Sequence, residues 1–224
     1  MTDDSYYLRG PATVCNPTGW FFDRIIREVV GPIEPPFRVL GVTYDYDRGE
    51  ATVDYVSPPT GPRPSTDEVI GYVVDRSLVV EEIARTARVY SRRVSRATAR
   101  TTPVRDDWAA ELRHDFPGWY DVDFECHAGW ADLLRAMSEG LWEIGLPQGF
   151  RFMQVKEKFG GLRAYVSVRT LTAEQTHTVR ARIDACEAVS FGICERCGDP
   201  GTVRKTDRGW FYTACDRHAR DPIA

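Results

Sequence analysis

The sequence lacks any long apolar run. None of its segments approaches the roughly 18 consecutive apolar residues that a membrane-spanning helix needs, although 42% of the 224 residues are hydrophobic. The first ten residues, MTDDSYYLRG, do not have the basic-then-apolar order of a signal peptide. Internal repeats and low-complexity tracts are absent, and the 12% aromatic content excludes a disordered chain. We therefore expect a folded cytoplasmic protein with no membrane partner.

Lysine is also scarce, because only 3 of the 29 basic residues are lysines. The formal net charge is −4, which by itself argues against a nucleic-acid partner. That total hides a partition: residues 1–64 carry −3, residues 65–105 carry +3 and residues 106–224 carry −4. Residues 85–105 contain seven arginines and no acid. The arrangement of the cations, and not their sum, is therefore the informative feature.

The six cysteines do not resemble a disulfide framework, because no leader directs the chain to an oxidising compartment. Three of them are isolated, and the other three cluster near the C-terminus with a histidine. Cys194 and Cys197 form a CxxC pair, and Cys215 and His218 form a CxxH pair after a hairpin-sized insert. Two close pairs on two turns are what a tetrahedral Zn²⁺ site requires. The spacing predicts one zinc ion bound by these four residues.

Four protein ligands fill the coordination sphere of zinc, so the predicted site is structural and not catalytic. The order of knuckle, hairpin and second ligand pair is typical of a treble-clef or zinc-ribbon module over residues 192–220. Nucleases of the HNH class also use treble clefs, but they need a histidine on the hairpin. Residues 202–213 contain none. The alternative to a zinc site is a chance grouping of reduced thiols.

The pattern along the chain predicts an α+β fold in three parts. Residues 1–62 form an N-terminal α+β segment, with a helix over 16–30 and a β-hairpin from 37–44 and 50–57. Residues 63–104 form an Arg-rich connecting helix that starts at a capping box of Ser65 and Glu68 and runs to about Arg100, unless residues 69–74 form a short strand. Residues 105–224 form the C-terminal α+β domain, which the zinc module closes.

Periodicity and turn residues define the elements of this last part. Helices are predicted at 108–116 and 129–144, and a third helix opens at a capping box of Thr172 and Gln175. A short strand is predicted at 122–126 and a second hairpin at 150–158 and 162–168, around a Phe-Gly-Gly turn. Trp119, Trp130, Trp142 and Trp210 are expected to be core anchors and not a base-stacking platform, with the exception that one of Trp210, Phe211 and Tyr212 should face outward on a strand.

Two groups of cations are candidate contacts to nucleic acid. The first lies on one side of the predicted Arg-rich helix, opposite an apolar side, where it could follow a phosphate backbone or pair with the acidic flanking regions. The second surrounds the Gly-Gly turn, which could hold an anion or be an ordinary tight hairpin with solvated charges. The candidate residues are Arg85, Arg88, Arg92, Arg96, Lys156, Lys158 and Arg163.

No catalytic residues are assigned. Cys126 and His127 are adjacent in the sequence, but neighbouring strand residues point to opposite faces, which disfavours a nucleophile–base pair. His114 and His177 are expected at the surface.

Several strings in residues 124–220 resemble a family of uncharacterised proteins encoded by bacteria, their phages and mobile elements. These strings are Gly129-Trp130 with Leu133-Leu134, the QVKEKFGGLR hairpin, CxxCG and CxxH. The resemblance implies a domain and a mobile-element context, with no reaction attached.

These observations predict a non-enzymatic, zinc-stabilised binding protein that contacts nucleic acid. One alternative is a protein-interaction factor, of the immunity or anti-defence type, that blocks a macromolecular partner. A second alternative is a nuclease or hydrolase that uses the Gly-Gly hairpin.

Overall fold

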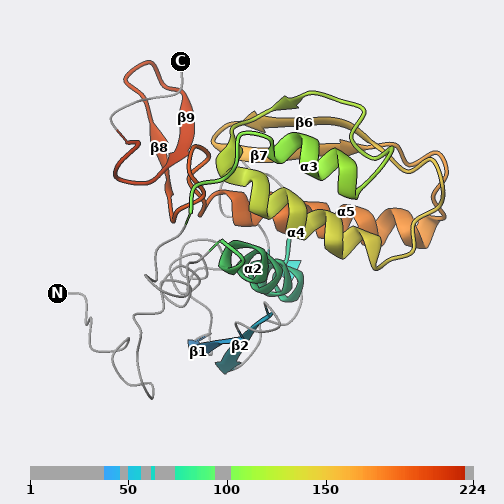
Figure 1. Ribbon diagram of the computed structural model, residues 1–224, viewed down its shortest axis with the longest axis horizontal. Helices are drawn as coiled ribbons and strands as arrows, with labels where there is room; N and C mark the ends of the chain where they lie inside the picture. Colours follow the sequence, from blue (N-terminus) through green and yellow to red (C-terminus); the bar gives the residue numbers. More distant parts are fainter. Residues whose placement is uncertain (1–37, 46–49, 57–61, 64–73, 94–101, 220–224) are drawn as a thin grey trace.

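The computed structural model describes residues 38–45, 50–56, 62–63, 74–93 and 102–219, and its elements form a mixed α+β architecture (Figure 1). The helix predicted over 16–30 lies outside these residues. In chain order the elements are β1 (Arg38–Asp45), β2 (Glu50–Val56), β3 (Pro62–Arg63), β4 (Val74–Asp75), α2 (Arg76–Ser91), α3 (Trp108–Asp115), β5 (Phe124–Glu125), α4 (Ala131–Trp142), β6 (Phe152–Lys158), β7 (Gly161–Val166), α5 (Ala173–Ser190), β8 (Thr202–Lys205) and β9 (Phe211–Ala214).

The first hairpin is confirmed: β1 and β2 pair antiparallel, with a register shift between Val39 and Gly41. The Arg-rich helix is shorter than predicted. It begins at Arg76, directly after the short strand β4, and it ends at Ser91 instead of near Arg100. Ser65, Glu68, Arg96 and the remaining residues of 94–101 lie outside the described part of the chain.

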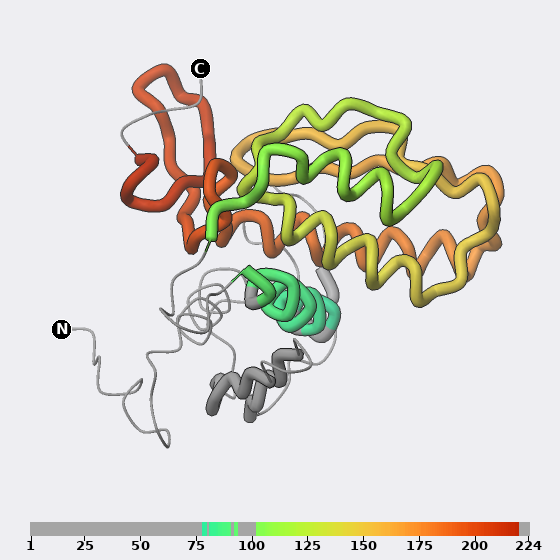
Figure 2. Tube along the Cα trace, viewed as in Figure 1, coloured from blue at the N-terminus to red at the C-terminus, as the bar shows by residue number. Residues whose placement is uncertain are grey.

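The main core lies between a three-stranded sheet and its helices (Figure 1). The sheet has the order β5-β6-β7, in which β5 runs parallel to β6, and β6 and β7 form the predicted antiparallel hairpin. Helix α5 packs on β7, and α4 and α2 pack on α5 and on each other. The trace in Figure 2 shows α2 alongside α4 and α5. Val79, Ile83 and Ala87 of α2 belong to the same core as α4, while the predicted boundary at residue 104 stays a prediction.

Helix α5 also protects the open edge of the sheet. The backbone N–H of Leu162 donates to Ser190 Oγ at 2.8 Å, and that of Ala164 donates to Glu187 Oε1 at 2.9 Å. An edge strand otherwise presents a row of unpaired donors to other chains. Side chains of α5 therefore close the β7 edge, and the predicted capping box at Thr172 and Gln175 closes the start of this helix.

The tryptophans divide between core and surface. Trp119 and Trp130 are buried as predicted. Trp142 is 57% exposed, so its assignment to the core was wrong: it is the last residue of α4, and its ring only borders Phe116 and Trp119. The assignment of Trp210 to the core was also wrong: it directly precedes β9, 71% of its surface is exposed, and it is the member of the trio 210–212 that faces outward.

Candidate metal centre and cation-bearing surfaces

The four predicted ligands meet at one point. One donor atom from each of Cys194, Cys197, Cys215 and His218 lies within 4.8 Å of the other three. The Cys197 and Cys215 sulfurs are 3.8 Å apart, and His218 Nδ1 is 3.4 Å from the sulfurs of Cys194 and Cys215. These four residues could hold a metal ion.

The donor spacing fits a tetrahedral centre. Zn–S bonds of about 2.3 Å and Zn–N bonds of about 2.05 Å at tetrahedral angles place two sulfurs about 3.8 Å apart and a sulfur and a nitrogen about 3.6 Å apart. The hydrogen bond from the Cys197 thiol and those from backbone donors lower the pKa of Cys194, and the same contact raises the pKa of Cys197, so the two sulfurs share a proton that a metal ion would displace. Thiolates, and not thiols, bind metal. The donor set fits a metal with no open position.

Local structure places the ligands. The first pair lies in a knuckle, where the backbone N–H of Gly198 donates to the carbonyl of Cys194 at 2.9 Å. The β8–β9 hairpin follows with the predicted antiparallel pairing. The second pair lies in a turn, where the N–H of His218 donates to the carbonyl of Cys215 at 3.0 Å. The hairpin therefore returns the chain to the knuckle and completes the set.

The knuckle docks on the start of α4. The backbone N–H of Gly129 donates to the carbonyl of Glu195 at 2.7 Å, and Trp130 Nε1 donates to the carbonyl of Ile193 at 3.0 Å. A Cβ at position 129 would lie 2.2 Å from the Cys194 carbonyl oxygen, so only glycine allows this approach. The Gly-Trp pair thus joins the metal module to the main core.

The Gly-Gly turn of the β6–β7 hairpin docks on β9 of the same module. A Cβ at Gly160 would lie 3.2 Å from the backbone nitrogen of Tyr212, and Thr213 Oγ1 donates to the Gly160 carbonyl. The N–H of Gly160 donates to Glu157 Oε1 at 2.5 Å. The Glu157 side chain therefore already accepts the hydrogen bond from the backbone N–H of the Gly-Gly turn, which the sequence suggested could bind an external anion.

All three lysines lie on these two docked hairpins. Lys156 and Lys158 are on β6, and Lys205 is on β8. Each ammonium lies over an aromatic ring, at 5.6 Å from the centroid of Tyr165, 5.2 Å from Phe159 and 5.3 Å from Phe211, respectively. Within the described part of the chain, no ion pair involves any of the three. Carboxylates of the described residues therefore do not neutralise the charges of these lysines.

Arg163 differs from the lysines beside it. Its side chain is buried, with its guanidinium 3.5 Å from Glu187 and 5.7 Å from the centre of the Phe191 ring. It therefore connects the sheet to α5 instead of facing solvent as the sequence suggested.

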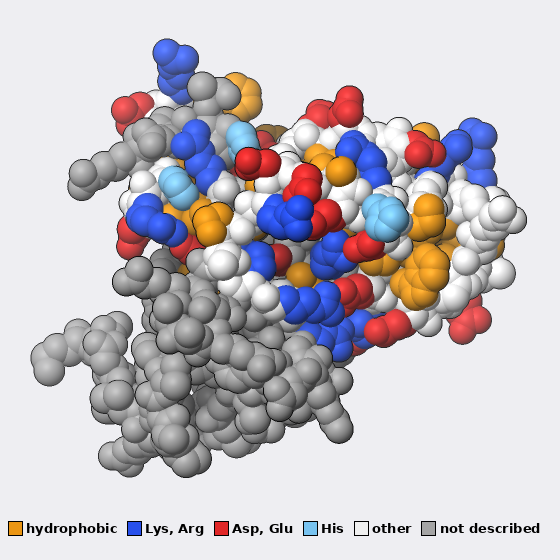
Figure 3. Space-filling model, in the orientation of Figure 1, with side chains coloured by type: hydrophobic (Ala, Val, Ile, Leu, Met, Phe, Trp, Pro, Cys, Tyr) orange, Lys and Arg blue, Asp and Glu red, His pale blue; other side chains and the backbone are white. Residues whose placement is uncertain are grey.

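The arginines of α2 and of the turn directly after it meet carboxylates of α4 and of Glu143, the residue that follows α4. Arg85 donates to Glu143 at 2.5 and 2.8 Å, and Arg92 donates to Glu139 at 2.8 Å. Arg88 lies 3.8 Å from Glu139. Figure 3 shows basic and acidic side chains interspersed over the described face. Of the two roles that the sequence allowed for these arginines, the structure shows ion pairing with acidic residues of the flanking region.

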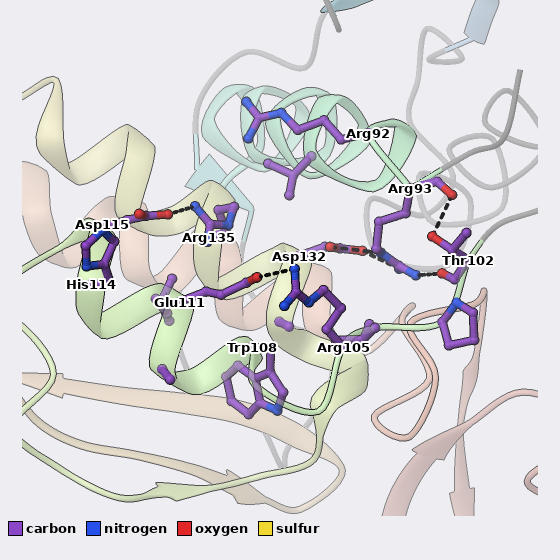
Figure 4. A pocket seen from close by; sticks show the side chains of 16 residues that line it. Arg92, Arg93, Thr102, Arg105, Trp108, Glu111, His114, Asp115, Asp132 and Arg135 are labelled. Atoms are coloured by element: carbon purple, nitrogen blue, oxygen red, sulfur yellow. Dashed lines mark hydrogen bonds and ion pairs between the residues drawn. The ribbon is translucent and has the colours of Figure 1, made fainter.

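A cavity of about 820 Å³ continues this pattern between α2, α3 and α4 (Figure 4). Arg93 donates to Asp132 at 2.9 Å, and Arg135 pairs with Asp115 at 2.6 Å. Arg105 lies 3.1 Å from Glu111. These three arginines pair with acids that line the cavity, and Arg92, which also lines it, pairs with Glu139, so the four arginines do not form an open cationic site.

Cys126 and His127 do not form a catalytic pair. Burial raises the pKa of the Cys126 thiol to about 12, which is typical of an inert cysteine. Burial also lowers the pKa of His127, whose backbone N–H donates to Glu195 Oε1 at 3.1 Å. His114 and His177 are exposed, as predicted.

Sequence reasoning did not single out two residues of the docked hairpins. Phe159 is the non-glycine residue with positive φ in the described part of the chain, and 45% of its surface is exposed. Arg208 is at the exposed tip of the β8–β9 hairpin. The sequence feature that could have identified both residues is that each lies directly before a glycine in a turn and that aromatic residues are in or next to that turn.

Among the described residues, no helix combines the length and the apolar character that crossing a bilayer requires. Comparison with protein-family models, curated proteins and solved structures finds no match to this chain.

Proposed function

We propose that the chain is a non-enzymatic binding protein, that one structural Zn²⁺ stabilises it, and that its partner is nucleic acid. The observation that carries the proposal is the location of the lysines. All three lie on the two hairpins that dock at the metal module, and no described carboxylate pairs with them.

Zinc is the metal that the donor set favours. Three thiolates and one imidazole at tetrahedral spacing select zinc over the oxygen-seeking cations Mg²⁺ and Ca²⁺. Four protein donors leave no place for a reactive water, which supports a structural role. The order of knuckle, hairpin and second pair supports a treble-clef or zinc-ribbon module.

Nucleic acid is the partner that the lysine surface favours. Lysines that lack internal carboxylate partners can neutralise phosphates and release counterions. The arginines of α2 are weaker candidates, because forming phosphate contacts would require them to leave Glu139 and Glu143.

The test is a fluorescence-anisotropy titration of labelled DNA and RNA oligonucleotides with the zinc-loaded full chain. We expect affinity that falls steeply with salt, and a large loss when Lys156, Lys158 and Lys205 are all changed to alanine. Arg92→Ala is the matched control, since it removes a half-exposed cation from the turn directly after α2. Absent binding, or binding independent of salt, would overturn the proposal. A loss in the Arg92 variant equal to that of the triple variant would move the interface to α2.

A protein partner is the second candidate, and a groove favours it. This groove has a volume of about 720 Å³ and lies at the end of α4, lined by Trp119, Trp142, Phe150 and two prolines. An exposed tryptophan beside a groove that combines aromatic and polar side chains is typical of protein-binding surfaces. Capture of one host protein that Trp142→Ala abolishes, together with absent oligonucleotide binding, would favour this candidate over nucleic acid.

A further inference from the structure

Two exposed aromatic residues mark the tips of the docked hairpins. Phe159 is in the β6–β7 turn, and Trp210 directly precedes β9. Their exposed fractions are 45% and 71%, although aromatic side chains normally contribute to stability by burial. Neither ring is needed for the core, since neither belongs to the buried clusters.

The backbone at Phe159 adds an independent argument. Its φ is +56°, a conformation that is costly for a bulky side chain and free for glycine. Glycine would therefore form the same turn with less strain. Strain of this kind is concentrated at functional sites, where the surrounding structure enforces it. Here Gly160, held against β9, fixes the turn that projects the Phe159 ring into solvent.

The fold brings the backbone of the two hairpin tips that carry Phe159 and Trp210 close together. Gly160 follows Phe159 directly and contacts the backbone of Tyr212, which is two residues from Trp210. Two strand residues span about 7 Å. The contact between Thr213 and Gly160 fixes the two tips relative to each other, and the backbone N–H of Glu195, which donates to the Thr213 carbonyl at 3.1 Å, holds β9 against the knuckle.

Cations lie near both tips. Lys158 Nζ lies 5.2 Å from the centre of the Phe159 ring, and Lys205 Nζ lies 5.3 Å from the centre of the ring of Phe211, the residue after Trp210. Arg208 is exposed two residues before Trp210. Asp207 is the acidic residue at this tip, and no ion pair joins it to a described cation. Exposed aromatic faces combined with unpaired cations are the pattern of single-strand binding, in which bases stack on rings and phosphates follow the cations.

We infer that Phe159 and Trp210 stack unpaired bases of a single-stranded nucleic acid, and that Lys158 and Lys205 contact its phosphates. This inference rests on the proposed function and specifies the class of its ligand. In a duplex each base face is covered by the neighbouring bases. A protruding aromatic ring can therefore stack on a base only in single strands, loops or ends. Stacking tolerates any base, so the site selects for strandedness more than for sequence.

The experiment compares a labelled single-stranded oligonucleotide of mixed sequence with the duplex of the same sequence, in both DNA and RNA forms. The zinc-loaded full chain is titrated at fixed salt, and binding is followed by fluorescence anisotropy. We expect tighter binding to the single strand, and binding weakened about 5- to 150-fold by Trp210→Ala. Trp142→Ala removes a similarly exposed tryptophan from the far end of α4 and should bind as the wild type does.

Phe159→Gly separates stacking from folding. Glycine relieves the positive φ, so the thermal midpoint should be kept or raised while single-strand binding falls. Equal affinity for both strand forms, with both aromatic variants binding like the wild type, would overturn this inference and leave the proposed function standing. Absent binding to every oligonucleotide at low salt would overturn both.

Discussion

The arginines of α2 and of the turn directly after it differ in environment from the lysines of the docked hairpins. Arg85, Arg88 and Arg92 each meet a carboxylate of α4 or of Glu143, and Arg93 meets Asp132. The lysines lie over aromatic rings, and no ion pair with the described residues holds them. A run of positive charge in a sequence therefore does not identify a surface that is open to a polyanion.

Side-chain chemistry explains the division. The arginine guanidinium is a planar fork that binds carboxylates in two places, which suits it to contacts between packed helices. Lysine presents a compact, strongly hydrated charge on a flexible stem, and it can bind a phosphate as a point charge without a fixed geometry. On the arginine side of the molecule, ion pairs join α2, α4 and α5 to one another.

The largest expected effect is on the lysine side, at the metal. Cys197→Ser removes one ligand, and because zinc capture is coupled to folding, the β8–β9 hairpin should lose its structure. Elemental analysis should find one zinc per wild-type chain and none in the variant, and hydrogen exchange should show unprotected β8–β9 amides. Cys126→Ser, which changes a thiol outside the cluster, should keep the zinc. Wild-type protein without zinc would refute the assignment.

The next effect is on the arginine side, at its buried pair. Arg182 pairs with Glu82, which has no exposed surface, so Arg182→Met leaves a buried carboxylate without its main cation. The free energy of unfolding should fall by about 3–5 kcal/mol in urea titrations. Changing Glu82 to methionine as well should recover most of the loss, because two apolar side chains need no partner. A single variant within about 1 kcal/mol of the wild type would contradict this expectation.

Glu187 links stability to pH. Burial raises its pKa from 4.5 to about 7, against the opposing effects of the Ala164 N–H and Arg163. Between these two values the folded state binds more protons than the unfolded state, so this carboxyl lowers stability as the pH rises from about 4.5 to 7. Glu187→Gln still accepts the Ala164 N–H but cannot titrate. It should reduce the fall in unfolding free energy over this window by at most about 3 kcal/mol. Identical pH profiles would rule out this role.

The smallest effect should come from the exposed arginine pair. Arg92 is 45% exposed and meets Glu139, so Arg92→Ala should cost no more than about 1 kcal/mol in the same urea titration. If Arg92→Ala lowered the free energy of unfolding as much as Arg182→Met does, the exposed arginine after α2 and the buried arginine of α5 would contribute equally to stability, which would contradict this expectation.

Local patterns predicted the elements whose signals lie within a few residues. The capping box at Thr172 and Gln175, the apolar periodicity of α4 and the turn between β6 and β7 each depend on neighbours in the chain. The metal cluster was predictable for the same reason, since each ligand pair spans one turn. The end of α2 and the exposure of Trp142 were not predictable, because both depend on where the helices stop relative to the packed core.

By itself, the sequence determined the α+β composition, the hairpins and the four residues that could hold a metal. Only the tertiary structure decided which cations are engaged. Arg85 meets Glu143 across 58 residues, Arg182 meets Glu82 across 100, and Gly160 meets Thr213 across 53. Such contacts follow from the packing of whole helices and hairpins, and no short-range pattern encodes them. The physical reason is that the partner of a charged side chain or of a turn depends on which element the fold packs against it.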